Sequence, residues 1–374
     1  MAGIYIHIPY CKQACYYCDF HFSTKIDNFQ ELTNAICKEI VLRKDYLEHE
    51  EIATIYFGGG TPSILPSECI KQILEQLHSY HNILNDAEIS LEANPEDLSI
   101  EKLKELKNIG INRLSIGIQT FNDDKLKWMN RIHDSNASIE AIKKAQAIGF
   151  ENITADLIYG IPSENNELFL NDLEQMISLG IPHISAYCLT IEEGTVFGKR
   201  KKKKTQPLAE EEFEAKQFEI LINTLQANGY EQYEISNFAK NEKYSKHNSS
   251  YWQQKKYLGL GPSAHSFNGI SREANISNNK KYIENISNNK IESFVEHLSD
   301  QEKINDYVLT TLRTKWGTNL KVANSILPNY EKIIEEQICE LKKQNLILVI
   351  NDIMYLTTEG KMLADWITEK LILV

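Results

Sequence analysis

Short β-branched or apolar runs alternate with longer amphipathic stretches through the first two thirds of the chain, and the alternation repeats six times. The predicted strands are residues 4–8, 53–57, 88–92, 113–117, 153–158 and 184–189, and the predicted helices are 28–47, 66–81, 100–109, 138–148, 167–179 and 210–227. This rhythm predicts an α/β fold with a parallel sheet and right-handed crossovers. Six units are too few for a closed eight-stranded barrel, which favours a partial (β/α)6 barrel over a flat doubly wound sheet. Both place a ligand site at the C-terminal ends of the strands.

Beyond Tyr230 the alternation stops. An aromatic, Gly-rich segment (233–267) precedes an Asn-rich stretch (275–290) that the composition predicts to be a connector. The chain from about residue 300 then reads as helices, followed by a hairpin around Asn351-Asp352 and a last helix. The ranges are 331–345 for the preceding helix, 346–350 and 353–356 for the hairpin strands, and 358–371 for the last helix. This order predicts an α+β winged-helix-like module.

Three parts follow from this pattern: a core at 1–235, the aromatic segment with its connector at 236–295, and an accessory module at 296–374. In the module, the helix at 331–345 carries four Glu against three Lys, which makes a poor surface for a DNA groove. We therefore interpret the module as one that packs against the core or covers substrate.

The chain has 374 residues and a formal net charge of -12, with 42% hydrophobic and 25% charged residues. Such a composition supports a packed core, and the acidic balance disfavours nucleic-acid binding. No apolar run reaches the ~18 residues of a membrane span, and no basic region opens the chain, so we expect a cytoplasmic protein that does not span a membrane. The basic run 199–204 is more typical of a solvated loop than of a handle for anionic partners.

Three of the seven cysteines cluster directly after the first strand, as Cys11, Cys15 and Cys18. The others are scattered singly, as buried structural thiols usually are: Cys37, Cys69, Cys188 and Cys339. Clustered thiolates suit an iron–sulfur cluster or zinc. Zinc would take a fourth ligand from His7 or His21, but structural zinc sites normally come as two separated ligand pairs. Three cysteines on a four-iron cluster leave one iron open for a ligand.

The segment 5–18, with its Cys-x3-Cys-x2-Cys spacing, resembles the radical S-adenosylmethionine (SAM) superfamily, in its oxygen-independent coproporphyrinogen III oxidase-like family. Further matches follow in order along the chain: Gly58-Gly59-Gly60-Thr61-Pro62, Glu92, Ser115-Ile116-Gly117-Ile118-Gln119, Arg131 and Asp156-Leu157-Ile158-Tyr159-Gly160. Phe20 stands where the dehydrogenase of this family has a fourth cysteine. The segment 247–252 matches the HNxxYW motif of the heme-chaperone members.

The residue types at the strand ends suit the parts of SAM. Glu92 can hold an ammonium group, Arg131 a carboxylate, and Gln119 and Asp156 ribose hydroxyls, although singly each fits an ordinary salt bridge or cap. By resemblance, the turn residues and two tyrosines also line this cofactor, namely Gly59, Gly60, Thr61, Tyr5 and Tyr17. A GGGTP turn alone is more often just a tight loop, but here it follows a strand one unit after the cysteines.

His247 is a candidate axial ligand for heme iron, with Tyr251 and Trp252 offering flat surface for a porphyrin. The alternative is that this aromatic loop simply seals the barrel mouth, and His265 is a competing ligand.

The resemblance implies a protein that holds a [4Fe-4S] cluster on Cys11, Cys15 and Cys18, binds SAM and heme, and transfers heme to an acceptor protein. It also implies an electron donor, because the reduced cluster passes an electron into the sulfonium of SAM. One alternative is oxidative decarboxylation of coproporphyrinogen III to protoporphyrinogen IX, against which the absent fourth cysteine counts. The other is a zinc-stabilised binding protein.

Overall fold

The computed structural model describes residues 1–26 and 28–373, and its main feature is one open sheet with the order β12-β11-β10-β9-β1-β2-β3-β4-β5-β6-β8-β7. Strands β1 to β6 lie in chain order and pair in parallel. Their bounds are β1 (Ala2–Ile8), β2 (Ile52–Gly59), β3 (Ile83–Ala93), β4 (Arg113–Gln119), β5 (Asn152–Tyr159) and β6 (His183–Cys188). The sheet ends at β12 and β7 instead of closing on itself. The predicted α/β fold with an open, partial (β/α)6 barrel is confirmed.

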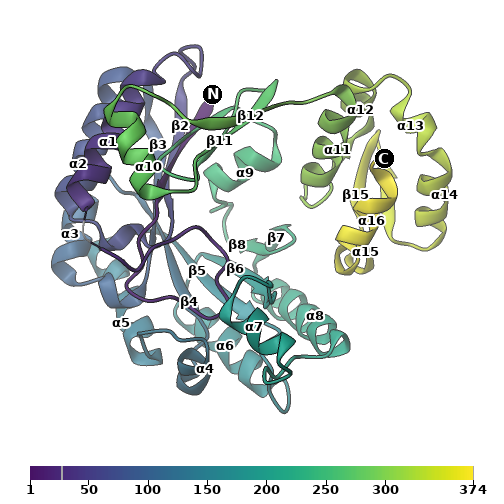
Figure 1. The fold of residues 1–374 in the computed structure, drawn as a ribbon. Coiled ribbons are helices and arrows are strands. Elements are labelled where there is room, and N and C mark those ends of the chain that lie inside the picture. Colours follow the sequence, from purple (N-terminus) through teal and green to yellow (C-terminus); the bar gives the residue numbers. More distant parts are fainter. Residues whose placement is uncertain (27, 374) are drawn as a thin grey trace.

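Helices connect these strands and cover the outside of the curved sheet (Figure 1). Their bounds are α1 (Phe29–Leu42), α2 (Ser67–Tyr80), α3 (Ile100–Asn108), α4 (Asp123–Trp128), α5 (Ser135–Ile148), α6 (Glu167–Ser178), α7 (Val196–Lys202) and α8 (Glu211–Ala227), with short 3-10 turns η1 (Pro62–Ile64) and η2 (Pro95–Asp97). The first helix is shorter than the predicted 28–47. The basic run 199–204, predicted as a loop, begins inside α7, where Thr195 caps the N-terminus and the lysines lie in the last turn, which favours positive charge.

Strand β1 shows how the core is built. Ile4, Ile6 and Ile8 are fully buried and belong to the same apolar cluster as Leu32 and Ile36 of α1. Since side chains alternate along a strand, Tyr5 and His7 face the inner side of the sheet. The inner side of β1 is therefore available to line a site.

The second part of the chain extends this sheet on both edges. Strand β9 pairs in parallel with β1, and β10, β11 and β12 follow as antiparallel neighbours, while β8 and β7 continue from β6. The bounds are β7 (Glu231–Glu234), β8 (Asn237–Ala239), α9 (Lys246–Trp252), β9 (Tyr257–Leu260), β10 (His265–Phe267), β11 (Ser271–Asn275), α10 (Asn279–Ser287) and β12 (Ser293–His297). The interpretation of 275–290 as a connector is wrong, because most of it is helix α10. The Asn-rich composition hid an amphipathic helix that buries Tyr282 and Ile286, one turn apart.

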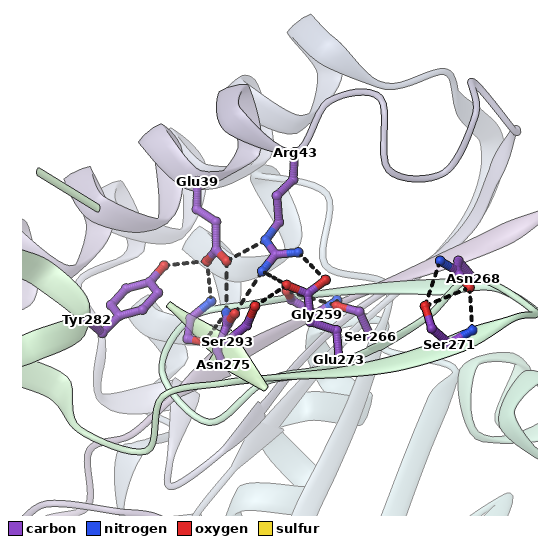
Figure 2. Close-up of polar contacts among 11 residues, drawn as sticks. Glu39, Arg43, Gly259, Ser266, Asn268, Ser271, Glu273, Asn275, Tyr282 and Ser293 are labelled. Carbon is purple, nitrogen blue, oxygen red and sulfur yellow. Dashed lines mark hydrogen bonds and ion pairs between the residues drawn. The ribbon is translucent and has the colours of Figure 1, made fainter. Parts of the chain in front are cut away.

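A buried polar network fastens this extension to α1 (Figure 2). The Glu39 carboxylate is fully buried and accepts hydrogen bonds from Arg43 (2.9 Å), the Asn275 side-chain amide (2.8 Å), the Gly261 backbone N–H (2.9 Å) and the Tyr282 hydroxyl. Arg43 in turn donates two parallel hydrogen bonds, of 2.7 and 2.8 Å, to the Glu273 carboxylate on β11. Residues more than 200 positions apart in the sequence are thus joined in one charged cluster.

The last part is a separate module that Figure 1 shows to one side of the sheet. Its elements are α11 (Asp300–Thr311), β13 (Thr318–Asn319), α12 (Leu320–Ile326), α13 (Tyr330–Ile333), α14 (Glu335–Lys343), β14 (Ile347–Ile350), β15 (Ile353–Leu356), α15 (Thr358–Met362) and α16 (Ala364–Leu371), with strand order β13-β15-β14. The predicted hairpin is confirmed, with Asn351 and Asp352 both at positive φ as a two-residue turn requires. The helices expected at 331–345 and 358–371 are each broken in two.

The module touches the main sheet through backbone hydrogen bonds from Lys315 to Tyr233 and from Ile235 to Arg313. The division at 235 and 295 stays a proposal, since β9 to β12 continue the main sheet. No helix within residues 1–26 and 28–373 is both long and apolar enough to cross a membrane.

We expect Glu39→Ala to lower the free energy of unfolding by about 3 to 5 kcal/mol, because Arg43 Nε, the Gly261 N–H and the Tyr282 hydroxyl lose their buried acceptor and the Arg43 charge loses one of its two carboxylate partners. Chemical denaturation at pH 7 measures this. The matched control is Lys71→Ala, which removes an exposed helix ion pair and is expected to change the same quantity by less than about 1 kcal/mol. Equal effects of the two substitutions would show that the network does not hold the extension in place.

Candidate cofactor site at the strand ends

A cavity of about 640 Å³ opens at the carboxyl ends of the parallel strands. Eleven of the thirteen residues predicted for cofactor or metal binding line it: Cys11, Cys15, Cys18, Tyr17, Gly59, Gly60, Thr61, Glu92, Gln119, Arg131 and Asp156. They come from six separate places along the chain: five are at the ends of strands β1 to β5 or in the loops directly after them, and the sixth is the turn after α4. The parallel sheet brings them together because the ends of its strands share one edge.

The three cysteines lie on the loop between β1 and α1, which is fastened at several points. The Cys11 N–H donates to Ser23 O (3.0 Å), and Asn130 reaches the loop from the turn after α4, donating to Ala14 O (2.7 Å). All three thiols are partly buried, and none forms a disulfide. In the described ranges, 1–26 and 28–373, no three His, Cys, Asp or Glu side chains already stand close enough together to hold a metal ion.

Two polar side chains contact the sulfur atoms of these cysteines. The Thr61 hydroxyl donates to Cys11 Sγ (3.4 Å), and Arg131 Nη1 lies 3.5 Å from Cys15 Sγ. Burial raises the pKa of Cys11 to about 11, and burial also raises that of Cys18. These thiols therefore stay protonated without a metal, and loading an iron–sulfur cluster must displace their protons.

The glycine turn after β2 packs directly against the start of the cysteine loop. A Cβ at Gly60 would lie 2.7 Å from Tyr10 O and 3.0 Å from Cys11 Sγ, and Gly59 has φ +112°, which favours glycine. Three soft thiols, a side-chain-free wall and a cavity of this size fit an iron–sulfur cluster with a small organic ligand beside it.

Two carboxylic acids face the cavity with raised pKa. Glu92 accepts hydrogen bonds from the Tyr56 hydroxyl (2.9 Å) and the Gly59 N–H (3.1 Å), yet its removal from bulk water raises its pKa to about 7. Asp156 accepts from the Ser115 hydroxyl (3.2 Å), and burial raises its pKa to about 7 as well. Both would be stabilised in the ionised form by a bound cation.

Arg131 supplies the opposite charge. Its Nη2 donates to Asn94 Oδ1 and to Gly117 O, both at 2.7 Å, so the guanidinium is fixed between the ends of β3 and β4. Nearby, Gln119 has φ +70°, an uncommon conformation for a residue other than glycine, of the kind found at functional sites. The cavity thus holds acids at one place and a fixed cation at another, which suits a zwitterionic ligand.

Tyr5 does not line this cavity. Its ring packs 6.1 Å from that of Tyr56, and its hydroxyl lies 3.2 Å from His7 Nδ1. Tyr5 instead lines a second cavity, of about 490 Å³. The resemblance placed Tyr5 beside SAM, whereas in the structure it stands on the neighbouring cavity's wall.

The candidate heme ligand His247 is not at the cavity either. It is 0% exposed, its Nδ1 lies 2.8 Å from Thr54 Oγ1, and its Nε2 lies 2.7 Å from the Tyr251 hydroxyl. Burial lowers its pKa to about 3, so the imidazole is neutral. The prediction that His247 ligates heme iron does not fit this geometry, because both ring nitrogens are already hydrogen bonded and the ring cannot be reached from solvent.

Sequence reasoning missed several cavity residues, among them Tyr56, Asn94 and Asn248. Tyr56 lies on β2, and Asn94 directly follows β3, so both come from strand ends that already held predicted residues. The alternation of side chains along β2, and Pro95 just after β3, were signals in the sequence that could have pointed to them. Asn248 follows His247 on α9, and neighbouring residues on a helix point about 100° apart. Only one of the pair can face the cavity, and it is the asparagine.

Comparison with known proteins identifies the class and the fold. The family model "Radical SAM superfamily" matches residues 5–176. The chain also superposes on coproporphyrinogen III oxidase (HemN) from Escherichia coli with a TM-score of 0.86 at 23% identity, covering 99% of this chain and 90% of that one. The chain therefore carries a radical SAM domain at residues 5–176, and this class of protein implies a [4Fe-4S] cluster and SAM.

Curated relatives identify one family within this class. The chain is 35% identical over 369 residues to heme chaperone HemW of Bacillus subtilis (strain 168), covering 98% of this chain and 97% of that protein. It is 37% identical to heme chaperone HemW of Escherichia coli (strain K12) over 269 residues, 70% of this chain and 69% of that protein. The chain belongs to the HemW family.

We expect the cofactor-free protein to lose stability as the pH rises from about 4.5 to 7. In this window the folded protein still holds the Glu92 and Asp156 protons, which the unfolded chain has already released at ordinary pKa values, so the free energy of unfolding falls with rising pH. Glu92→Gln should remove part of the fall, on the order of 1 to 3 kcal/mol. Thermal unfolding between pH 5 and 8.5 measures it, with the exposed Glu75→Gln as control. If the stability of Glu92→Gln fell with rising pH as steeply as that of the wild type, the raised pKa of Glu92 would be contradicted.

Proposed function

We propose that this protein binds heme and passes it to acceptor proteins, and that it does so with a [4Fe-4S] cluster and SAM held in the strand-end cavity. The observation that carries the proposal is the cavity itself, which gathers three thiols, two acids and a fixed guanidinium in a chain of the HemW family. Heme and an acceptor are the partners that the relatives' name implies.

Cys11, Cys15 and Cys18 would hold the cluster, leaving one iron for SAM. When bound, the cluster supplies an electron to the sulfonium of SAM, and an external electron donor restores it. The protein's own contribution is positional: Thr61 and Arg131 contact the sulfurs of Cys11 and Cys15. Such outer contacts orient the ligands and tune the redox potential of a cluster.

The charges of the cavity match the amino-acid end of SAM. Glu92 would hold the ammonium group, and in doing so it gives up the proton that its raised pKa retains. Arg131 would hold the carboxylate through its planar guanidinium. Gln119 and Asp156 would hydrogen bond the ribose hydroxyls, and Tyr17 would lie against the adenine.

The alternative activity, conversion of coproporphyrinogen III, draws on the likeness to HemN, which at 23% identity shows the fold. Phe20 argues against it, because this residue replaces a cysteine of the dehydrogenase and is 74% exposed at the cavity edge. An aromatic side chain cannot take over a thiol's acid–base or ligand role.

Serine substitution of Cys11, Cys15 or Cys18 should abolish the broad visible absorption of the anaerobically reconstituted cluster and leave less than about a tenth of the iron, because a hard hydroxyl replaces a soft thiolate. Cys188→Ser is the matched control, since Cys188 lines the same cavity from the end of β6. Iron and sulfide analysis accompanies the spectra. A Cys188 variant without the cluster, beside a Cys15 variant that keeps it, would refute the ligand set. Stoichiometric zinc in place of iron would favour the zinc-stabilised alternative.

The reconstituted protein should bind heme in a defined stoichiometry and release it to a heme-free globin, yet form no protoporphyrinogen IX from coproporphyrinogen III with SAM and a reductant. Heme transfer is followed by the acceptor's Soret band and the porphyrin product by fluorescence after oxidation. Turnover of coproporphyrinogen III at about 1 s⁻¹ or faster, the ordinary range of enzymes, would replace the chaperone function with the dehydrogenase one.

A further inference from the structure

A second cavity of about 490 Å³ lies on the inner side of β1, β9 and β10. Among the described residues, Phe20 is the one side chain that lines both this cavity and the cofactor cavity. The two spaces are therefore neighbours with an aromatic ring at their boundary.

The walls of this second cavity are aromatic. Tyr251 and Tyr257 meet edge to face with centroids 4.6 Å apart, and Phe267 lies 6.4 Å from Tyr257. With Tyr5 and the exposed Phe20, they offer flat apolar surface to a large planar ligand.

Three histidines also line the cavity, but their nitrogens differ in availability. His7 is engaged by the Tyr5 hydroxyl at Nδ1 and by His21 O at Nε2, while His21 Nε2 lies 2.8 Å from Asn279 Oδ1. For the His265 ring, no hydrogen-bond partner is found among residues 1–26 and 28–373. Burial, and then the charge of Arg272, lower the pKa of His265, so its imidazole is neutral at pH 7, the form that binds iron.

Two cations complete the lining. Arg272 on β11 pairs with Asp306 but remains 42% exposed, and Lys255 lies exposed in the turn between α9 and β9. A macrocycle that carries two carboxylates would find a positive group for each.

We propose that this second cavity is the heme site, with His265 as an axial ligand of the iron and with Arg272 and Lys255 receiving the two propionates. The proposal rests on the function proposed above and adds where heme lies. It also gives the HNxxYW segment a role: His247 hydrogen bonds the hydroxyl of Tyr251 from behind, and Tyr251 presents its ring to the cavity. His247 is then a positioning residue for the porphyrin wall.

The test is an anaerobic titration of cluster-loaded protein with hemin and, separately, with hemin dimethyl ester. His265→Ala should weaken hemin binding about tenfold or more and shift the Soret band, because the iron loses its imidazole. His49→Ala, at a histidine that is 80% exposed in the turn after α1, should bind hemin as the wild type does. Arg272→Gln should weaken binding of hemin about fivefold or more but leave the uncharged ester unaffected.

Cluster content serves as the measure of folding in each variant. If His265→Ala loses its cluster, the comparison of hemin with its ester in Arg272→Gln decides the location instead. If Arg272→Gln bound both ligands as the wild type does, or if a folded His265→Ala kept an unchanged Soret band, the proposed location of heme would be wrong. The proposal that the protein binds heme would still stand. Failure of the wild-type protein to bind hemin would instead overturn the proposed function.

Discussion

The parallel pairing of β1 to β6 is the constraint on which the site depends. The register pairs Ile8 with Gly59, and Gly117 with Asp156, so residues that are distant in sequence end at one level of the sheet. Each strand contributes one or two polar groups there, and the loop after β1 carries the three thiols. A change of register in any pair would move its groups to the other face or out of the cavity.

The electrostatics of the cavity follow from that convergence. Glu92 and Asp156 sit in the same poorly solvated space, and each stands near the other's charge, which makes two carboxylates unfavourable without a cation. Arg131 is fixed by Asn94 and by the end of β4, so it cannot swing over to neutralise both acids. Without a bound cation, Glu92 and Asp156 therefore keep protons that a bound ammonium group would replace.

The strands and most of the site could be predicted because their signals are local: apolar runs, glycine stops and polar residues at strand ends. The remainder depends on contacts between distant residues or on which face a residue takes. Nothing near Glu39 in the sequence reveals that its partners are Asn275 and Tyr282, so helix α10 was missed. Similarly, the sequence places His247 and Asn248 next to each other. Only the packing of α9 on β1 and β2 decides that His247 is buried against Thr54 while Asn248 faces the cavity.

The separation of the two cavities bears on the proposed transfer of heme. A heme held against Tyr251 and Tyr257 would lie beside the cofactor cavity without entering it, with the Phe20 ring between them. In that arrangement Glu92 and Arg131, the proposed contacts of SAM, need not move for heme to bind or leave. Binding of the two ligands would then be coupled chiefly through Phe20 and through the shared wall formed by Tyr5 and Tyr56, whose rings stack. Conversion of a porphyrin with the proposed SAM would need the porphyrin to reach the cofactor cavity itself, whereas binding and transfer of heme would not.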